Sequence, residues 1–328
     1  MKNMDIKEIS LSDIKGIQVG HAQSVEGGTG CTAILCKEGA WAGVDVRGGG
    51  PATRETDLLR SENMVQQIHG VMLSGGSAYG LDACSGVMAY LEEKGVGFDV
   101  GVGVVPIVCG ASLFDLVVGD STCRPDKDMG YKACVDSERN QPEQGNAGAG
   151  TGATVGKFLG MDRLMKSGLG IYALQAGDVQ CAAVVAVNAL GDVLDLDTGK
   201  PIAGILNEDG TGLASTEEIM LNQIAASRNV FSGNTTIGCI ITNAKLTKPQ
   251  ANKLASICHD GYARTISPVH TSADGDTIFT MATGQVDASF EALGVLAARV
   301  MAKAINNAVR HAKPAYGLKA ACDLEKGC

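Results

Sequence analysis

The chain has 328 residues, of which 45% are hydrophobic and 19% are charged, and its formal net charge is -9. This balance is typical of a packed globular protein of one large or two ordinary domains, and it excludes a disordered chain. The acidic residues are spread along the sequence and no basic stripe is present, so we expect no nucleic-acid partner. No segment reaches ~18 uncharged apolar residues and the N-terminus has no apolar signal region, so we expect a cytoplasmic protein with no membrane contact.

Cysteine and histidine are present without a pattern that would hold a metal. The eleven cysteines fall at scattered spacings with no C-x-x-C pair, and the five histidines form no H-E-x-x-H arrangement. Buried thiols that pack as small hydrophobes are the expected state. We therefore expect neither a metal nor a cofactor. The 44 glycines lie inside apolar runs as well as in loops, which predicts close approach between backbones.

The first half of the chain begins with three short β-like runs, at residues 16–21, 31–36 and 41–46. The turn at 37–39 predicts that the last two runs form a hairpin. A buried strand at 71–73 then leads through a turn into a helix over 81–94, which we expect to end at Gly95. Residues 121–147 are polar and are expected to form a long excursion before the glycine tract.

The second half alternates strands and helices. We expect strands at 169–174, 181–187, 237–241 and 277–281, and helices at 216–226, 248–264 and 289–311. Thr247 is the expected N-cap of its helix. Residues 227–234 are expected to form an exposed linker, and residues 313–328 a mobile tail. Antiparallel pairs with grouped helices favour an α+β fold in which two glycine-rich sheets stack between helical layers.

Residues 233–238 join a polar segment directly to the apolar run at 237–241. A hydroxyl residue at the head of a buried strand, preceded by Gly-Asn, suits a self-cleaving precursor, because Thr235 can attack the Asn234 carbonyl and become a new N-terminus. Such a threonine carries nucleophile and base on one residue, since its α-amino group has an unperturbed pKa of ~7.7 to 8.0. Taken alone, such a short Gly-Asn-Thr sequence is more often a polar loop that leads into a strand.

The glycine tract at 145–157 has two phosphate-loop interpretations, and neither fits. A P-loop requires glycine at position 151 and Ser or Thr at position 158, where this chain has Thr151 and Phe158. A dinucleotide fingerprint requires a preceding buried strand, whereas residues 137–144 are polar. Lys157 at the end of the tract could instead stabilise developing negative charge or lower the pKa of a neighbouring group.

Three further positions could carry chemistry, although each has a more ordinary explanation. Ser77 follows a strand as a hydrolase nucleophile would, but its G-x-S-x-x-G context is one residue out of register, which favours a tight turn lining a pocket. Asp274 and Asp276 share a face if extended and could couple to a hydroxyl, although Asp-Gly-Asp is usually a solvated turn. Asn188 at a strand end is more often a turn residue than an oxyanion donor.

Together these stretches resemble the DmpA-type family, which comprises self-cleaving L-aminopeptidase/D-amidase-esterases, β-peptidyl aminopeptidases and nylon-oligomer hydrolases. The resemblance runs from about residue 14 to residue 311 and is carried by residues 16–21, 46–57, 74–81, the glycine tract and 234–236. It implies one domain over 1–312 with a four-layer αββα sandwich, similar to N-terminal-nucleophile hydrolases but with different connectivity. It further implies cleavage into chains 1–234 and 235–328, assembled as a homo-oligomer, by resemblance a tetramer of processed units.

The resemblance also implies a role for each site residue. Thr235 would be the nucleophile, exposed by cleavage after Asn234, with Lys157 beside it, Asn188 as an oxyanion donor, and Asp274 with Asp276 as a relay to the Thr235 hydroxyl. These spacings are most similar to those of the nylon-oligomer hydrolases. Phe114 stands where the family has a tyrosine, and with Ser77 and Tyr79 it is expected to line the substrate pocket.

The function predicted from the sequence is thus a self-processing N-terminal-threonine amidohydrolase acting on small peptides or amino-acid amides through an acyl-enzyme. Two alternatives are an acyltransferase of the ornithine acetyltransferase type and a non-catalytic ligand-binding protein of the same fold. The acyltransferases usually carry Ala-Thr-Met-Leu-Gly at the cleavage site, and this chain does not. In the non-catalytic protein Thr235 would never be freed.

Overall fold

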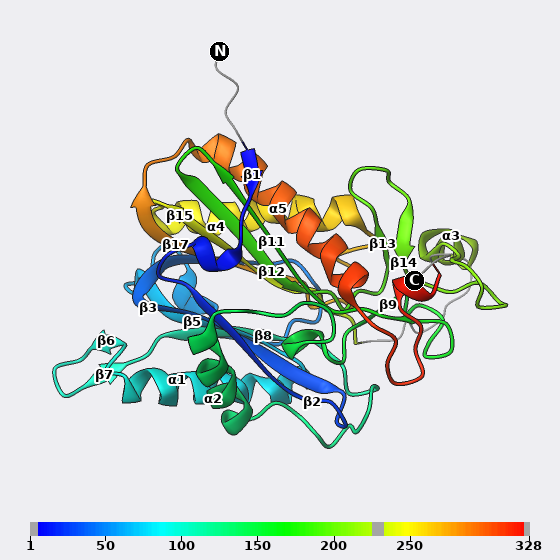
Figure 1. The fold of residues 1–328 in the computed structure, drawn as a ribbon, viewed down its shortest axis with the longest axis horizontal. Helices are drawn as coiled ribbons and strands as arrows, with labels where there is room; N and C mark the ends of the chain where they lie inside the picture. The colour runs from blue at the N-terminus through cyan, green and yellow to red at the C-terminus, as the bar shows by residue number, and fades with distance from the viewer. Residues whose placement is uncertain (1–5, 225–232, 325–328) are drawn as a thin grey trace, which may run out of the picture.

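An 18-residue strand, β3 (Thr29–Val46), connects the two halves of the β structure in the computed structural model, which describes residues 6–224 and 233–324 (Figure 1). Its first part pairs with β2 (Gln18–Ser24) and β5 (Gln67–Ser74), and its last part pairs with β17 (Thr277–Val286). The strand order is β1-β11-β12-β15-β17-β3-β5-β8-β4, with β2 paired to β3. The remaining strands of this order are β1 (Ile6–Glu8), β4 (Thr53–Arg54), β8 (Val108–Ser112), β11 (Leu169–Ala176), β12 (Val179–Ala186) and β15 (Ile237–Ala244).

The two halves stack face to face between two layers of helices. One buried cluster joins Ile34 and Val71 from the first half to Ala182 and Ile241 from the second. The outer face of the second half packs against α4 (Lys248–Thr265) and α5 (Phe290–His311), and that of the first half against α1 (Ala83–Glu93) and α2 (Lys127–Asp136) (Figure 1). This α-β-β-α order confirms the predicted α+β fold class.

Short elements lie outside the main sheet. In the described residues they are one helix, α3 (Thr216–Asn222), and seven short strands: β6 (Phe98–Asp99), β7 (Val104–Val105), β9 (Thr154–Val155), β10 (Met165–Lys166), β13 (Asp192–Leu194), β14 (Pro201–Ala203) and β16 (Ile266–Ser267). Both β14 and β16 pair with β13. The expected helix at 216–226 therefore ends at Asn222, and its last two residues lie outside the described part of the chain.

The predicted hairpin across residues 37–39 is wrong, because β3 passes straight through this turn. The pairing of β3 with β5 shifts register between Leu35 and Ala40, and Gly39 lies in this interval with φ +84°. The strand needs its full length because each end pairs with a different half of the sheet. Helix α2 forms within the polar excursion at 121–147, and its N-cap is Asp126, whose side chain accepts from the Met129 N–H.

Other predicted boundaries agree with the structure. Helix α1 ends at Glu93, and Gly95 follows with φ +68°, the left-handed conformation expected after a helix. Helix α4 begins after Thr247, whose side chain accepts from the Gln250 N–H while the Gln250 side chain returns to the Thr247 backbone. Local sequence chemistry therefore fixes these ends.

Glycine lets the helices approach the sheet closely, as the composition predicts. A Cβ on Gly170 of β11 would lie 1.9 Å from the Ala304 carbonyl oxygen of α5, and one on Gly43 of β3 would lie 2.2 Å from the Asn252 nitrogen of α4. A Cβ on Gly20 of β2 would lie 2.1 Å from the Ser137 nitrogen, just after α2. No larger residue fits at these three contacts without moving a helix.

The chain after α5 is packed rather than loose. Ala320 and Ala321 are buried, residues Ala321–Asp323 form a short 3-10 helix, and Ala315 bridges to Leu318. The expectation of a loose tail does not hold for residues 320–324, because Ala321 belongs to the core beneath α5 and Leu324 packs against it. Residues 325–328 lie outside the described part of the chain.

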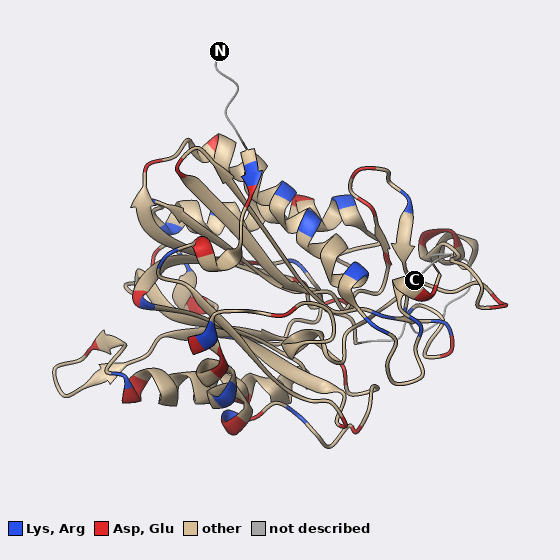
Figure 2. Ribbon diagram, in the orientation of Figure 1, with Lys and Arg blue, Asp and Glu red and all other residues tan. Residues whose placement is uncertain are grey.

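Helix α5 is long and apolar enough to cross a membrane by length and composition alone, but 67% of its most apolar window is buried in the protein. It is the central core helix over β11 and β12. Figure 2 shows that Lys, Arg, Asp and Glu lie mainly on the helices and loops, whereas the strands between the helical layers carry few of them. Charged side chains buried at the ends of those strands therefore require a specific explanation.

Candidate active site

Thr235 lies just before β15, where the register of two neighbouring strands fixes it. Ile237 of β15 pairs with Ala186 of β12 on one side and, in parallel, with Thr277 of β17 on the other. The Thr235 N–H donates to the Asn188 carbonyl at 2.9 Å, and the Gly275 N–H donates to the Asn234 carbonyl at 2.9 Å. Both sides of the peptide bond between Asn234 and Thr235 are therefore held by backbone contacts.

The predicted linker to Thr235 spans residues 227–234, of which 227–232 lie outside the described residues. Asn234 at its end is buried rather than exposed, since it forms a parallel bridge with Asp274. Gly233 has φ +137°, and a Cβ there would lie 2.5 Å from the Phe114 ring. The chain thus enters the site through a position that only glycine fills without strain.

The Thr235 hydroxyl lies beside the carbonyl group of the peptide bond that precedes it. It donates to the Asn234 carbonyl oxygen, and the residue is 4% exposed. A Cβ on Gly275 would lie 2.7 Å from the Thr235 Oγ1 and 2.9 Å from the Gly50 carbonyl oxygen. The loop between the two aspartates therefore passes directly against the hydroxyl, and glycine is needed for this contact.

Lys157 is fully buried and lies next to this segment. Its Nζ donates to Asn188 Oδ1 at 2.6 Å, to the Asn188 carbonyl at 3.1 Å and to the Gly233 carbonyl at 3.2 Å. Burial lowers the pKa of Lys157 to about 7, and the negative charges of Asp274 and Asp115 oppose that shift. Three acceptors match the three donors of an ammonium group, so the charged form is accommodated without water.

Asn188 connects the lysine to the opposite wall of the site. Its Oδ1 accepts from Lys157 and from the Thr154 N–H at 3.0 Å, and its Nδ2 donates to the Phe114 carbonyl at 2.9 Å. The structure thus brings Asn188, Lys157 and Thr235 together as predicted. In the uncleaved chain the amide donor of Asn188 is occupied, so its role toward an oxyanion stays a prediction.

The two aspartates bind different partners. Asp274 Oδ2 accepts from the Thr271 N–H at 2.9 Å and from the Thr271 hydroxyl at 2.6 Å. Asp276 Oδ1 accepts from the Thr236 N–H at 2.8 Å. Burial, and secondarily Asp276, raises the pKa of Asp274 to about 6. Within the described residues neither carboxylate bonds to the Thr235 hydroxyl, so the predicted relay makes no direct contact in the uncleaved chain.

A cavity of about 230 Å³ opens onto this group. It is lined by small and hydroxyl side chains and one aromatic ring: Gly50, Ala52, Ser77, Ser112, Phe114, Gly233, Asn234, Thr235, Ser272 and Ala273. Ser77 and Phe114 line it as predicted, but Tyr79 does not. Tyr79 is 61% exposed with the Arg124 guanidinium 3.7 Å above its ring, because the 3-10 helix that begins at Ser77 turns residues two apart to different sides.

Asp115 is a buried residue of the site that the sequence interpretation missed. Its carboxylate accepts from the Gly76 N–H at 2.6 Å and from the Thr29 hydroxyl at 2.7 Å, and so holds the turn that ends at Ser77. Burial raises its pKa, while those bonds and Lys157 lower it. A lone carboxylate inside the apolar run 113–118 is a sequence signal that could have found it, since a buried charge needs partners.

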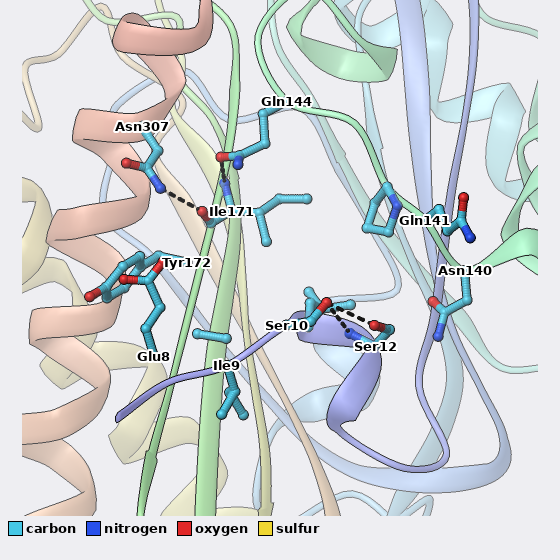
Figure 3. Close-up of a pocket in the computed structure, with 13 residues that line it drawn as sticks. Glu8, Ile9, Ser10, Ser12, Asn140, Gln141, Gln144, Ile171, Tyr172 and Asn307 are labelled. Atoms are coloured by element: carbon cyan, nitrogen blue, oxygen red, sulfur yellow. Dashed lines mark hydrogen bonds between the residues drawn. The ribbon is translucent and has the colours of Figure 1, made fainter. Parts of the chain in front are cut away.

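A second hollow, of about 360 Å³, lies where residues 8–12 pass beside β11 and contains none of these residues (Figure 3). Its polar groups bond to one another: Ser10 to Ser12, the Asn307 amide to the Ile171 carbonyl, and Gln144 to the Ile171 N–H. Across residues 6–224 and 233–324, no group of three or more His, Cys, Asp or Glu is placed to hold a metal.

The sequence matches a known peptidase family. The model for peptidase family S58 covers residues 10–322. The chain belongs to peptidase family S58. An uncharacterized aminopeptidase of Mycobacterium leprae is 39% identical over 97% of this chain and 94% of its own length. A 6-aminohexanoate-oligomer endohydrolase of Agromyces is 31% identical over 91% of this chain and 85% of its own.

Two solved structures of aminopeptidases share the fold. A Burkholderia beta-aminopeptidase aligns with a TM-score of 0.70 at 18% identity, covering 96% of this chain and 92% of that chain. The L-aminopeptidase D-Ala-esterase/amidase of Ochrobactrum anthropi, described as a variant of the Ntn hydrolase fold, aligns with a TM-score of 0.69 at 16% identity, covering 94% and 89%. These findings confirm the DmpA-type resemblance, and the S58 protein is a hydrolase of peptide bonds.

Gly275→Ala tests whether the loop against the hydroxyl is essential. The new methyl would meet the Thr235 Oγ1 at 2.7 Å, so we expect amide hydrolysis to fall by about 10-fold to 100-fold through displacement of the hydroxyl. Gly212→Ala is the matched control, because the nearest atom to its Cβ is the Asn207 side chain at 3.3 Å. Equal turnover by both variants would contradict the assigned geometry.

Proposed function

We propose that this S58 hydrolase cleaves itself between Asn234 and Thr235, and that the freed Thr235 is the nucleophile of an amidohydrolase of the aminopeptidase type. The observation that carries the proposal is the position of the Thr235 hydroxyl at the Asn234 carbonyl, which also accepts the Gly275 N–H at 2.9 Å. Nucleophile, carbonyl group and a donor for the developing negative charge are already in place before any substrate binds.

Self-cleavage follows from this geometry as an acyl shift. The Thr235 oxygen attacks the Asn234 carbonyl carbon, and the Gly275 N–H stabilises the oxyanion. The C–N bond then breaks, the Thr235 nitrogen takes the hydroxyl proton, and an ester links Asn234 to the Thr235 oxygen. Water hydrolyses the ester, which leaves a carboxylate on Asn234 and a free amine on Thr235.

Turnover uses the same residues with the new amine as base. In the uncleaved chain the Thr235 nitrogen and Lys157 Nζ bond to the same Asn188 carbonyl, at 2.9 and 3.1 Å. A freed amine at that position lies beside the lysine, whose positive charge favours the neutral amine. The neutral amine takes the hydroxyl proton, and the oxygen attacks the carbonyl carbon of the substrate amide. The Thr235 ammonium returns that proton to the substrate nitrogen as the C–N bond breaks, so the leaving group departs as a neutral amine. Water then hydrolyses the ester of the acyl-enzyme and releases the acid.

We assign the remaining roles by position. Asn188 would turn its amide from the Phe114 carbonyl to the oxyanion of the substrate, while Asp276 fixes the backbone of Thr236. The cavity of about 230 Å³ at Thr235 suits the acyl part of a small peptide or amino-acid amide. Names of relatives support this class of substrate, since one is an aminopeptidase and another hydrolyses 6-aminohexanoate oligomers.

Intact mass of the purified protein tests self-cleavage. We expect two fragments, residues 1–234 and 235–328, that stay associated because the second contributes β15, β17, α4 and α5. Thr235→Ala removes the hydroxyl and is expected to remain one inactive chain, whereas Thr235→Ser keeps a hydroxyl and is expected to be cleaved. A wild-type chain that stays whole and fully active would refute the mechanism.

The pH profile of the cleaved enzyme tests the base. Because the unperturbed amine has a pKa of ~7.7 to 8.0, we expect turnover to rise with pH through this range on both an uncharged ester and an amine-bearing amide. The pKa of Lys157 is about 7, so its positive charge is present mainly on the acid side of this limb. Lys157→Met removes that charge, so the acid side of the limb should move to higher pH. A limb seen only with the amine-bearing substrate would belong to the substrate instead.

A further inference from the structure

His270 contacts the site from outside the group that the proposed mechanism uses. Its Nδ1 lies 2.8 Å from Asp276 Oδ2, and its backbone N–H donates to the same oxygen at 3.2 Å. The His270 side chain is 18% exposed and the Asp276 side chain is 2% exposed. One carboxylate oxygen is thus held twice by a single residue, in surroundings where water cannot easily replace either donor.

The other oxygen of Asp276 connects this contact to the nucleophile. It accepts from the Thr236 N–H at 2.8 Å, one residue from Thr235. On the opposite side of the same residue, the Thr236 carbonyl accepts from the Thr277 N–H at 3.1 Å and from the Tyr262 hydroxyl at 3.3 Å. Thr236 is therefore fixed at both its N–H and its carbonyl, and His270 acts on the N–H side through Asp276.

The backbone of His270 is held in a conformation that costs energy. Its φ of +56° lies in the left-handed region, which residues other than glycine rarely adopt. Such a conformation persists where the surroundings determine it, and it is more frequent at functional sites. In this conformation the backbone N–H and the ring Nδ1 of His270 both face Asp276.

The rest of the ring is enclosed by α4. The His259 ring lies 4.7 Å away, edge to face, and the Tyr262 ring lies 6.0 Å away, stacked. His259 itself bonds to the Asp45 carbonyl at 3.1 Å. Among the described residues the His270 Nε2 is buried without a hydrogen-bond partner, so Nδ1 is the nitrogen that connects this ring to the site.

We propose that His270 is a positioning residue for the hydrolase: its Nδ1–H holds Asp276 so that the carboxylate keeps the Thr236 N–H, and hence the Thr235 hydroxyl, aligned for attack. This inference rests on the proposed function. It concerns the rate of the chemical step, so loss of the contact should lower kcat and the rate of self-cleavage while KM changes little. A role in packing alone would lower stability and leave these rates unchanged in the folded protein.

The test compares four histidine variants of the full chain, each measured below its melting temperature. His270→Asn places an amide donor near the position of Nδ1 and tolerates φ > 0, whereas His270→Gln carries the same amide on a longer arm, and His270→Phe keeps only the ring. His259→Phe is the matched control, because it alters the same aromatic cluster but has no bond to Asp276. Self-cleavage is followed by intact mass, turnover by kcat and KM, and stability by thermal melting.

We expect His270→Phe and His270→Gln to lower kcat and the cleavage rate by about 10-fold to 100-fold, His270→Asn to restore most of the loss, and His259→Phe to lose stability with near-normal rates. If the Phe variant does not fold, the Asn and Gln comparison decides. Equal rates in the Asn and Gln variants, or a rate loss in His259→Phe that matches His270→Phe, would overturn the inference. Thr235→Ala in the same series separates the two claims. If Thr235→Ala is active, the proposed function is rejected. If Thr235→Ala is inactive while His270→Phe and His270→Gln are fully active, only the role of His270 is rejected.

Discussion

The parallel pairing of β15 with β17 is the constraint on which the site depends. Parallel strands start at the same edge of a sheet, so the residues that precede Ile237 and Thr277 must lie side by side. This brings the peptide bond between Asn234 and Thr235 against the Asp274 to Asp276 loop, although about 40 residues of sequence separate the two segments. Because β12 borders β15 on its other side, Asn188 at the end of β12 completes the enclosure. A one-residue slip of either strand would remove the hydroxyl from its partners.

Burial sets the chemistry of this edge. Lys157 and Asp274 are both buried, and burial moves their pKa values toward neutrality from opposite directions, to about 7 and about 6. Groups that titrate near neutral pH can exchange protons readily, which is the usual requirement of acid and base chemistry. Their protein partners are mostly backbone groups of the segments that meet here, so the same contacts that fix the backbone also stabilise the charges.

Much of this could be predicted from the sequence, because local chemistry determines local structure. Thr247 and Gly95 fixed helix ends, the glycines indicated close packing, and the motif around Thr235 located the strand head. Contacts between distant segments could not be predicted in this way. Continuation of β3 through residues 37–39 depends on pairing with two different halves of the sheet. The direction of Tyr79 depends on a 3-10 helix that the sequence interpretation did not include. The packing of residues 320–324 and the bond from His270 to Asp276 depend on tertiary contacts, which no sequence spacing encodes.

The central claim is that the hydrolase forms its acyl-enzyme on Thr235, and trapping that intermediate tests it most directly. Cleaved protein would be treated with an activated ester of a small amino acid, quenched in acid, digested and mapped by mass spectrometry. We expect one acyl group on the hydroxyl of the peptide that begins at Thr235, and none in the Thr235→Ala variant. An acyl group on Ser77 or Ser112, which line the same cavity, with Thr235 unmodified, would contradict it.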